Sequence, residues 1–142
     1  MSEFNQALID QIRANHGQVT EGYFAGRQVL ILTTTGAKTG ESRESPLAYS
    51  RDGNDLVIVA SMGGAPTHPA WYHNLVANPL VKVEANGETY EADAVVVDPE
   101  ERRRLYDQHA DLHVSFKDYE DKTSRVIPVI RLKRRGSAVA AA

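Results

Sequence analysis

Apolar residues recur at helical spacing near the start of the chain. Phe4, Leu8, Ile9 and Ile12 repeat every three to four positions with polar residues between them, which predicts an amphipathic helix over residues 1–17. We expect its apolar stripe to pack on the rest of the domain. Contact with a membrane surface or with a partner protein is the alternative for the same stripe.

Six extended runs follow and predict the strands of the fold. The runs 28–35, 55–61, 80–85 and 88–97 are rich in β-branched and other apolar residues. The runs 43–50 and 126–133 contain Pro46 and Pro128, which cannot donate to a sheet ladder and therefore predict edge positions or bulges. Residues 51–54 (RDGN) and Asn86-Gly87 predict hairpin turns. The first three strands are therefore expected to be antiparallel neighbours.

Helical patterns interrupt the strands twice. Residues 66–78 predict a short helix, with Pro69 in its first turn and Asn78-Pro79 as its stop. Asp98 and Glu101 predict a capping box for a helix from about residue 99 to residue 110. Ser115 and Asp118 repeat that device for a shorter helix.

The order of these elements predicts the fold class. Helices lie between strands three and four and between strands five and six, which favours an α+β fold built on a small antiparallel β-barrel over a sandwich or a parallel sheet. At 142 residues, the chain 1–142 is expected to form a single domain. Residues 136–142 are expected to be a flexible tail.

Composition and charge narrow the classes of function. The chain has no cysteine, which excludes disulfides, thiolate metal sites and a cysteine nucleophile, and fits a reducing cytoplasm. No run is long and apolar enough for a membrane span, and the N-terminus lacks the apolar core of a signal peptide. The net charge of −3 argues against binding to nucleic acid. An anionic ligand would therefore need a local cluster of cations.

Residues 36–43 (GAKTGESR) form such a cluster on a loop with glycine at both ends. Lys38 and Arg43 supply two cations, and the loop offers backbone N–H groups, which together suit a phosphate. The segment is not a P-loop, because Glu41 follows Gly40 where that motif has lysine. An ordinary solvated hairpin tip fits the same residues.

A second loop and the helix after it could approach a flat ligand. Residues 61–66 (SMGGAP) bring small residues to the end of a buried strand, although a plain strand-to-helix turn has the same composition. Trp71 and Asn74 share one helix face, where a core tryptophan is the alternative.

Histidines and serines do not form a complete site in the sequence. His109 and His113 have metal-ligand spacing, but no third ligand is placed to complete a metal site. A G-x-S-x-G elbow is also absent. We therefore expect the chemistry to come from a bound cofactor.

Three stretches resemble the deazaflavin-dependent nitroreductase family of actinobacteria: LILTTTGAKTGESRESPLAY, VIVASMGGAPTHPAWYHNLVANPLVKVE and DYEDKTSRVIPVIRL. The resemblance runs from about Val29 to Leu132 and depends on the patterns T-T-x-G-x-K-[ST]-G and P-x-W-Y-x-N-L-x-A-N-P. It implies a split β-barrel and coenzyme F-420, a deazaflavin with a phosphate and an oligoglutamate tail. It also implies reduction of quinones, nitroaromatics and activated C=C bonds such as those of coumarin-type lactones.

The resemblance further implies roles for individual residues. The phosphate and acidic tail would be held by Lys38, Thr39 and Arg43. The deazaflavin slot would be formed by Pro46, Ala60, Ser61, Met62, Trp71 and Asn74. The acceptor pocket would be formed by Ala48, His113, Phe116 and Tyr119. Tyr119 and Ser61 are the candidate catalytic residues, with Tyr119 or water delivering a proton after hydride transfer.

The chain departs from this pattern at several positions. Ala37 and Met62 stand where many relatives have basic residues, so weaker coenzyme binding is expected. Ala48 and His113 replace aromatic residues often found at the acceptor pocket, so the substrate is expected to differ. The alternatives are an FMN- or haem-binding barrel, with FMN less expected than coenzyme F-420, and a non-catalytic deazaflavin carrier or sensor. We expect a monomer or a weak homodimer.

Overall fold

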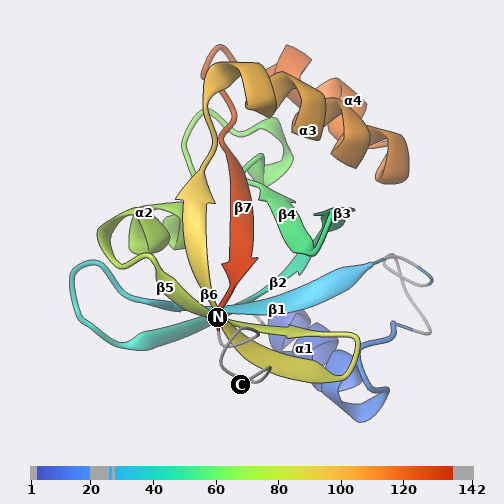
Figure 1. Cartoon of the computed structure of the whole chain (residues 1–142), viewed down its shortest axis with the longest axis vertical. Helices are drawn as coiled ribbons and strands as arrows, with labels where there is room; N and C mark the ends of the chain where they lie inside the picture. Colours follow the sequence, from blue (N-terminus) through green and yellow to red (C-terminus); the bar gives the residue numbers. More distant parts are fainter. Residues whose placement is uncertain (1–2, 20–25, 27, 136–142) are drawn as a thin grey trace.

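The computed structural model describes residues 3–19, 26 and 28–135, and its centre is one curled antiparallel sheet (Figure 1). The strand order is β2-β1-β5-β6-β7-β4-β3. The strands are β1 Val29–Thr35, β2 Ser42–Ala48, β3 Ser50–Asp52, β4 Asp55–Val59, β5 Leu80–Ala85, β6 Glu88–Val96 and β7 Val129–Arg134.

The connection between β2 and β3 closes the sheet into a barrel-like shape. These two strands lie at opposite ends of the strand order, yet Tyr49 alone separates them in the chain. The sheet must therefore curl until its two edges approach each other. Tyr49 is buried, and its N–H donates to the carbonyl of Gln28 at 3.1 Å. Among the described residues, no strand pairs with the outer edge of β2, and this open edge borders the site.

Alternating side chains of the strands fill the interior. One buried cluster combines residues of β1, β4, β5 and β7 with Trp71 and Leu75 of α2 (Ala70–Ala77). In β4, Leu56 and Ile58 belong to this cluster. Val57 and Val59 point the other way, because successive side chains of a strand face opposite sides.

Helices cover the outside of the sheet. In α1 (Glu3–Ala14), Leu8, Ile9 and Ile12 are buried against Val29 and Ile31 of β1, as expected for a stripe that packs on the domain. These side chains are therefore not available for membrane contact, and the side chain of Phe4 lies outside the described part of the structure. No helix among the described residues is long and apolar enough to cross a bilayer.

The remaining helical segments lie between β4 and β5 and between β6 and β7. They are η1 (Met62–Gly64) before α2, and then α3 (Pro99–Leu112), α4 (Phe116–Tyr119) and η2 (Glu120–Lys122). Asp98 caps α3 as predicted, accepting from the N–H of Glu101 at 2.9 Å, whereas the Glu101 carboxylate pairs with Arg104 and Arg131. Ser115 makes no such cap for α4, because its own backbone is already helical.

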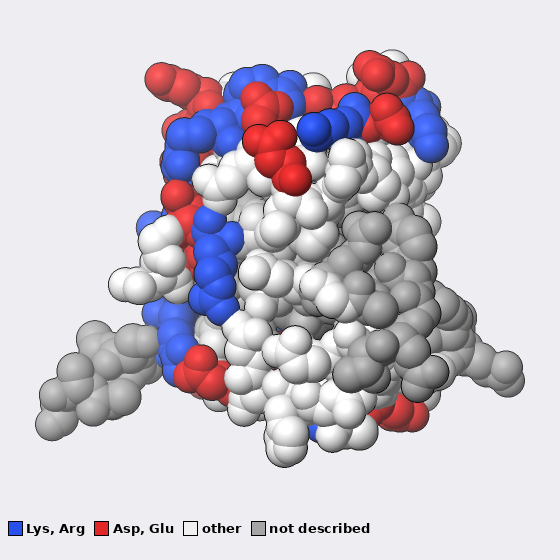
Figure 2. All heavy atoms as spheres, turned by 90° about the vertical axis from the view of Figure 1, so that its right-hand side faces the viewer, with Lys and Arg blue, Asp and Glu red and all other residues white. Residues whose placement is uncertain are grey.

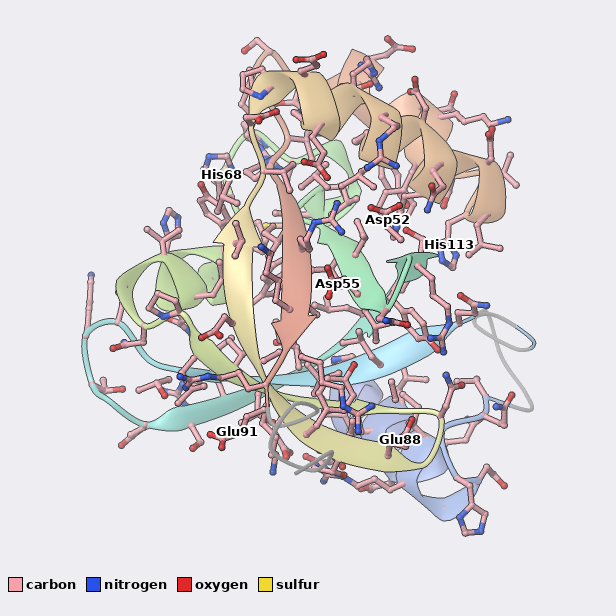
Figure 3. All side chains as sticks on the ribbon, viewed as in Figure 1. Asp52, Asp55, His68, Glu88, Glu91 and His113 are labelled. Atoms are coloured by element: carbon pink, nitrogen blue, oxygen red, sulfur yellow. The ribbon has the colours of Figure 1, made fainter. Side chains whose placement is uncertain are left out.

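Ion pairs hold α3 against the sheet. Arg131 of β7 pairs with Asp52, Asp55 and Glu101, so the β3–β4 hairpin and the start of α3 share one guanidinium. Asp52 and Asp55 lie beneath α3 in Figure 3. Charged side chains of both signs gather over the top and along the left margin of Figure 2, whereas the middle of that face is uncharged.

The α+β barrel and most of its elements confirm the sequence analysis. Asn86 and Gly87 form the predicted turn, with φ of 53° and 78°. The sheet has seven strands instead of six, because the predicted run 43–50 is interrupted at Tyr49: β2 ends at Ala48, and a separate strand begins at Ser50.

Two predictions of strand position were wrong. β4 pairs with β7 and not with β2, so the first three predicted strands are not all neighbours. β7 lies in the middle of the sheet, because Pro128 precedes the strand and offers only its carbonyl to Ala60. Pro46 does lie in an edge strand. The predicted tail 136–142 is outside the described residues.

Candidate active site

Two adjoining cavities follow the open edge of β2. The larger has a volume of about 740 Å³ and runs beside residues 42–45, between the β1–β2 loop and α2. The smaller has a volume of about 220 Å³ and runs beside residues 46–48, between η1 and α4. Trp71, which is 9% exposed, lines both cavities. A flat ligand in the larger cavity would therefore reach the smaller one at this indole ring.

The β1–β2 loop forms one wall of the larger cavity. The N–H of Gly36 donates to the carbonyl of Glu41 at 2.7 Å, and the Thr39 hydroxyl accepts from the N–H of Glu41. The side chains of Lys38 and Arg43 are exposed at the cavity, and Arg43 pairs with Glu41 at 3.3 Å. Because both side chains are exposed, neither is held in place by burial, and Arg43 can exchange its exposed partner for a ligand.

Helix α2 forms the opposite wall and is tied to the end of β1. Asn74 Oδ1 accepts from the N–H of Ala37 at 3.0 Å, and its Nδ2 donates to Thr34 Oγ1 at 3.2 Å. Asn78 adds a longer bond of 3.4 Å to the carbonyl of Thr35. The cation-bearing loop and the tryptophan helix therefore line the same cavity.

A row of three residues across the sheet also lines the larger cavity. Thr33 of β1 pairs with Glu44 on one side and with Lys82 on the other, and all three lie at the cavity. The buried Thr33 hydroxyl has no hydrogen-bond partner within the part of the chain that the structure describes. Such an orphaned group favours a ligand that can bond to it. Lys82 is a third cation that the sequence analysis missed.

Aromatic residues line the smaller cavity. The rings of Phe116 and Tyr119 of α4 pack at a tilt with centroids 4.9 Å apart, and the His113 ring centroid lies 6.0 Å from that of Phe116. His113 Nε2 donates to the carbonyl of Tyr49 at 2.8 Å, which fixes the ring against the β2–β3 connection. Figure 3 shows His113 at the C-terminal end of α3, beside β3.

Behind this wall, His109 is fully buried. Its Nδ1 lies 3.0 Å from the Ser50 hydroxyl, and its ring packs edge-on against Phe116. Burial, and to a smaller degree His113, lowers the pKa of His109 to about 3. His109 is therefore neutral at physiological pH, and we assign it to packing.

Arg125 holds the loop between β4 and α2, part of which lines the smaller cavity. Its Nε donates to the carbonyl of Ala65 (2.9 Å), its Nη1 to that of Ala60 (3.1 Å) and its Nη2 to that of Ser61 (2.6 Å). Nη1 also lies 2.8 Å from His68 Nδ1, which must accept because a guanidinium has no acceptor. Burial lowers the pKa of His68, and the charge of Arg125 lowers it further. The sequence analysis gave Arg125 no role.

The same loop is pressed against the segment that carries Tyr119. Gly64 has φ of +83°, and a Cβ there would lie 2.9 Å from the Tyr119 carbonyl and 2.7 Å from Lys122 Cβ. Met62 also has positive φ, 48°, and its side chain is 55% exposed at the smaller cavity. The loop conformation thus depends on close packing against α4 and η2.

The predicted site residues divide between the two cavities. The larger cavity is lined by Lys38, Thr39, Arg43, Trp71 and Asn74. The smaller is lined by Pro46, Ala48, Ser61, Met62, Trp71, His113, Phe116 and Tyr119. Ala60 is the exception: it lines neither cavity, because its side chain faces the barrel interior on the same side of β4 as Leu56 and Ile58.

Comparison with known proteins identifies the family to which this chain belongs. The family model described as F420H(2)-dependent quinone reductase matches residues 6–134. The chain is 38% identical over 126 residues to an F420H(2)-dependent quinone reductase of Mycobacterium tuberculosis, which is 87% of this chain and 85% of that protein. This chain belongs to the F420H(2)-dependent quinone reductase family. The resemblance seen in the sequence is confirmed.

Solved structures agree with the quinone reductase family assignment. A structure of an F420-H2 dependent reductase (FDR-A) has a TM-score of 0.69 and 35% identity, covering 74% of this chain and 93% of that one. A second structure, described as a domain-swapped dimer, has a TM-score of 0.71 and 31% identity, covering 93% of this chain and all of that one. The split-barrel fold of the family is therefore also the fold of this chain.

The residues at the larger cavity fit the coenzyme of the quinone reductase family. Three cations suit an anionic tail, the indole of Trp71 suits a planar ring, and the orphaned Thr33 hydroxyl offers a hydrogen bond. A cavity of about 740 Å³ is within the usual range for cofactor sites. Ala37 adds no charge, but its N–H fixes the loop to Asn74, and Lys82 supplies a cation from another strand.

Proposed function

We propose that this protein is an oxidoreductase that transfers a hydride from reduced coenzyme F-420 to a quinone. The observation that carries the proposal is the position of Trp71, which lines both the cation-rich cavity and the aromatic pocket. A coenzyme held in the first would present its ring at the mouth of the second. Membership of the quinone reductase family supports the same reaction.

The chain's own residues bind and orient the two reactants. Lys38, Arg43 and Lys82 attract the acidic tail of the coenzyme, and the Thr39 hydroxyl and loop N–H groups are available to its phosphate. Trp71 and the β2 edge confine the ring. The coenzyme supplies the hydride, so the protein needs no nucleophile and contributes orientation and exclusion of water.

The smaller cavity is the proposed acceptor site. Phe116 and Tyr119 provide aromatic faces for a flat, electron-poor molecule, and Ser61 and Tyr119 are the proposed proton donors. Nitroaromatics and activated lactones of the coumarin type share the flat shape and electron-poor character of quinones. We propose them as further acceptors of the same pocket.

Anaerobic titration with coenzyme F-420, followed by a panel of acceptors, tests the proposal. We expect saturable binding and oxidation of the reduced coenzyme by menadione. The proposal fails if no binding is found at about 50 µM coenzyme. Tight binding without turnover of any acceptor would instead identify a carrier, and protein purified with bound FMN or haem would point to those cofactors.

Substitution of the proposed proton donors separates binding from chemistry. Y119F should lower kcat for menadione by about tenfold to a hundredfold, because the phenolic hydroxyl is lost. The affinity for the coenzyme should stay unchanged, because the aromatic ring is kept. S61A gives the matching test for the serine hydroxyl. If both variants keep the wild-type kcat, the proton comes from water.

We further propose a cytoplasmic protein that is a monomer or a weak homodimer. The burial of the apolar face of α1 supports a location away from the membrane. The relative described as a domain-swapped dimer makes a dimer the alternative to test. Light scattering after size-exclusion chromatography, over a range of protein concentrations, distinguishes the two states.

A further inference from the structure

The wall of the larger cavity contains one acidic residue among its charged members. Lys38, Arg43 and Lys82 are cationic, whereas Glu44 of β2 carries a carboxylate. Glu44 and Lys82 flank Thr33 on neighbouring strands, and directly paired residues of antiparallel strands have side chains on the same face. An unpaired carboxylate at this position would repel any anionic ligand in the cavity.

Helix α1 supplies the charge that neutralises Glu44. Arg13, in the last turn of α1, donates from Nη2 to Glu44 Oε2 at 2.5 Å. The same guanidinium bonds to both carboxylate oxygens of Glu84 in β5, from Nε at 3.0 Å and from Nη2 at 2.8 Å. The bonds to Glu84 and then to Glu44 raise the pKa of Arg13, and Arg13 lowers the pKa of Glu84. Arg13 is therefore held in place by one carboxylate while it pairs with the other.

The two carboxylates differ in their position relative to the cavity. Glu44 lines the larger cavity, whereas Glu84 lines a separate small hollow beside the end of α1 and the β5–β6 turn. The packing of Ile9 and Ile12 on Ile31 fixes the end of α1 over this part of the sheet. Loss of Arg13 would thus expose two negative charges, of which only that of Glu44 faces the ligand.

We propose that Arg13 is a positioning residue of the coenzyme site, which favours binding of the anionic coenzyme by pairing with Glu44 and offsetting its charge at the cavity wall. This inference rests on the proposed function, since it needs an anionic guest in the larger cavity. It gives α1 a role in ligand binding although α1 does not line that cavity. Arg13 also adds to the positive charge near a site that has Ala37 and Met62 in place of basic residues.

Binding of oxidised coenzyme F-420, followed by its fluorescence, tests the proposal without turnover. R13Q should weaken binding by about threefold to tenfold, because the carboxylate of Glu44 then lies unpaired at the wall of the ligand cavity. R13Q/E44Q should bind within about twofold of wild type, since the repelling carboxylate is gone. The matched double variant R13Q/E84Q should recover binding less than R13Q/E44Q does, because Glu84 does not line the larger cavity. The difference between wild type and R13Q should shrink between about 0.05 and 0.5 M salt.

The binding results distinguish a role of Arg13 in ligand binding from a role in anchoring the helix. If R13Q binds as wild type does, or if E44Q and E84Q restore binding equally, the proposal is overturned and Arg13 only anchors the helix. If wild type itself binds no coenzyme, the proposed function fails and this inference falls with it. Should R13Q fail to fold by circular dichroism, E44Q alone must bind at least as tightly as wild type; weaker binding by E44Q would overturn the proposal.

Discussion

At the scale of single residues, Arg125 is the clearest addition to the site. Its guanidinium bonds to three main-chain carbonyls and one imidazole, all within residues 60–68. The sequence could not indicate this, because carbonyl acceptors exist at every position and carry no sequence signal. Lys82 was missed for a related reason: its place at the cavity depends on the pairing of β5 with β1, about fifty residues away.

Other residues were predictable from local patterns or from the family resemblance. Lys38, Arg43, Trp71 and Asn74 lie where their motifs suggested, around one cavity. The error at Ala60 was avoidable, because alternation along β4 places Leu56, Ile58 and Ala60 on the interior side. The roles assigned to Ser61 and Tyr119 stay predictions until the variants above are measured.

Replacement of Arg125 should impair catalysis through the loop that it holds. R125M leaves three carbonyls and His68 without their donor, so we expect kcat/KM for the acceptor to fall by about tenfold to a hundredfold. The free energy of unfolding should fall by about 1–3 kcal/mol. R125K, which keeps the charge but not the planar fork, should recover part of kcat.

The matched control is Arg135, an exposed arginine that pairs with Asp93. R135M should change the free energy of unfolding by less than about 0.5 kcal/mol and leave kcat unchanged. If R125M loses stability but keeps the wild-type kcat and KM, Arg125 has no part in shaping the acceptor pocket.

At the scale of elements, local signals were reliable and long-range pairing was not. The turn at Asn86-Gly87 and the cap at Asp98 depend on residues next to each other in the chain, and both formed as predicted. The central place of β7 depends on strands 35 and 70 residues earlier, for which the sequence pattern contains no direct evidence. Pro128 suggested an edge, yet the strand simply begins one residue later.

The packing of η1 against α4 and η2 gives a prediction for Gly64, with the neighbouring Gly63 as its control. Gly63 and Gly64 both have positive φ, so alanine at either position costs about 1–2 kcal/mol of backbone strain. Only at Gly64 would the new Cβ meet neighbouring atoms, among them the Tyr119 carbonyl. G64A should therefore lower kcat/KM for the acceptor by about tenfold more than G63A, because it displaces the wall of the pocket.

Steady-state kinetics with menadione, together with thermal melts of both variants, checks this expectation. Equal kinetic losses in G63A and G64A would mean that backbone strain alone matters. In that case the contact between the loop and Tyr119 has no influence on the acceptor.

At the scale of the whole molecule, buried histidine couples the stability of the fold to pH. Burial holds the pKa of His109 at about 3, against an ordinary value of 6.5 in an unfolded chain. Below pH 6.5 the unfolded chain therefore takes up a proton that the folded protein does not. Stability is fully present above that pH and is lost progressively as the pH falls towards 3. The lowered pKa of His68 acts in the same direction.

H109Q should make the protein less sensitive to acid. Between about pH 7.5 and pH 5.0 we expect the His109 contribution to remove about 2 kcal/mol from the wild-type free energy of unfolding, and H109Q should lack this loss. Urea titrations at the two pH values measure the difference. Asp52, whose pKa Arg104 and then Arg131 hold at about 2, loses its contribution only at lower pH.

His16, an exposed histidine with φ of 55°, provides the control. Asparagine tolerates that backbone conformation, so H16N should keep the wild-type dependence on pH. An unchanged loss of stability in H109Q would assign the acid sensitivity to other groups.

The single residue that joins β2 to β3 limits how two copies of this protein could exchange parts. Tyr49 is too short a hinge for one strand to leave while the other stays, because the two lie at opposite edges of the same curled sheet. A copy that donated β2 would have to carry β3 with it, together with the hairpin that β3 forms with β4. Exchange between two chains would therefore move residues 42–59 as one block or leave them in place, and the strand that borders both cavities would stay joined to β3 and β4.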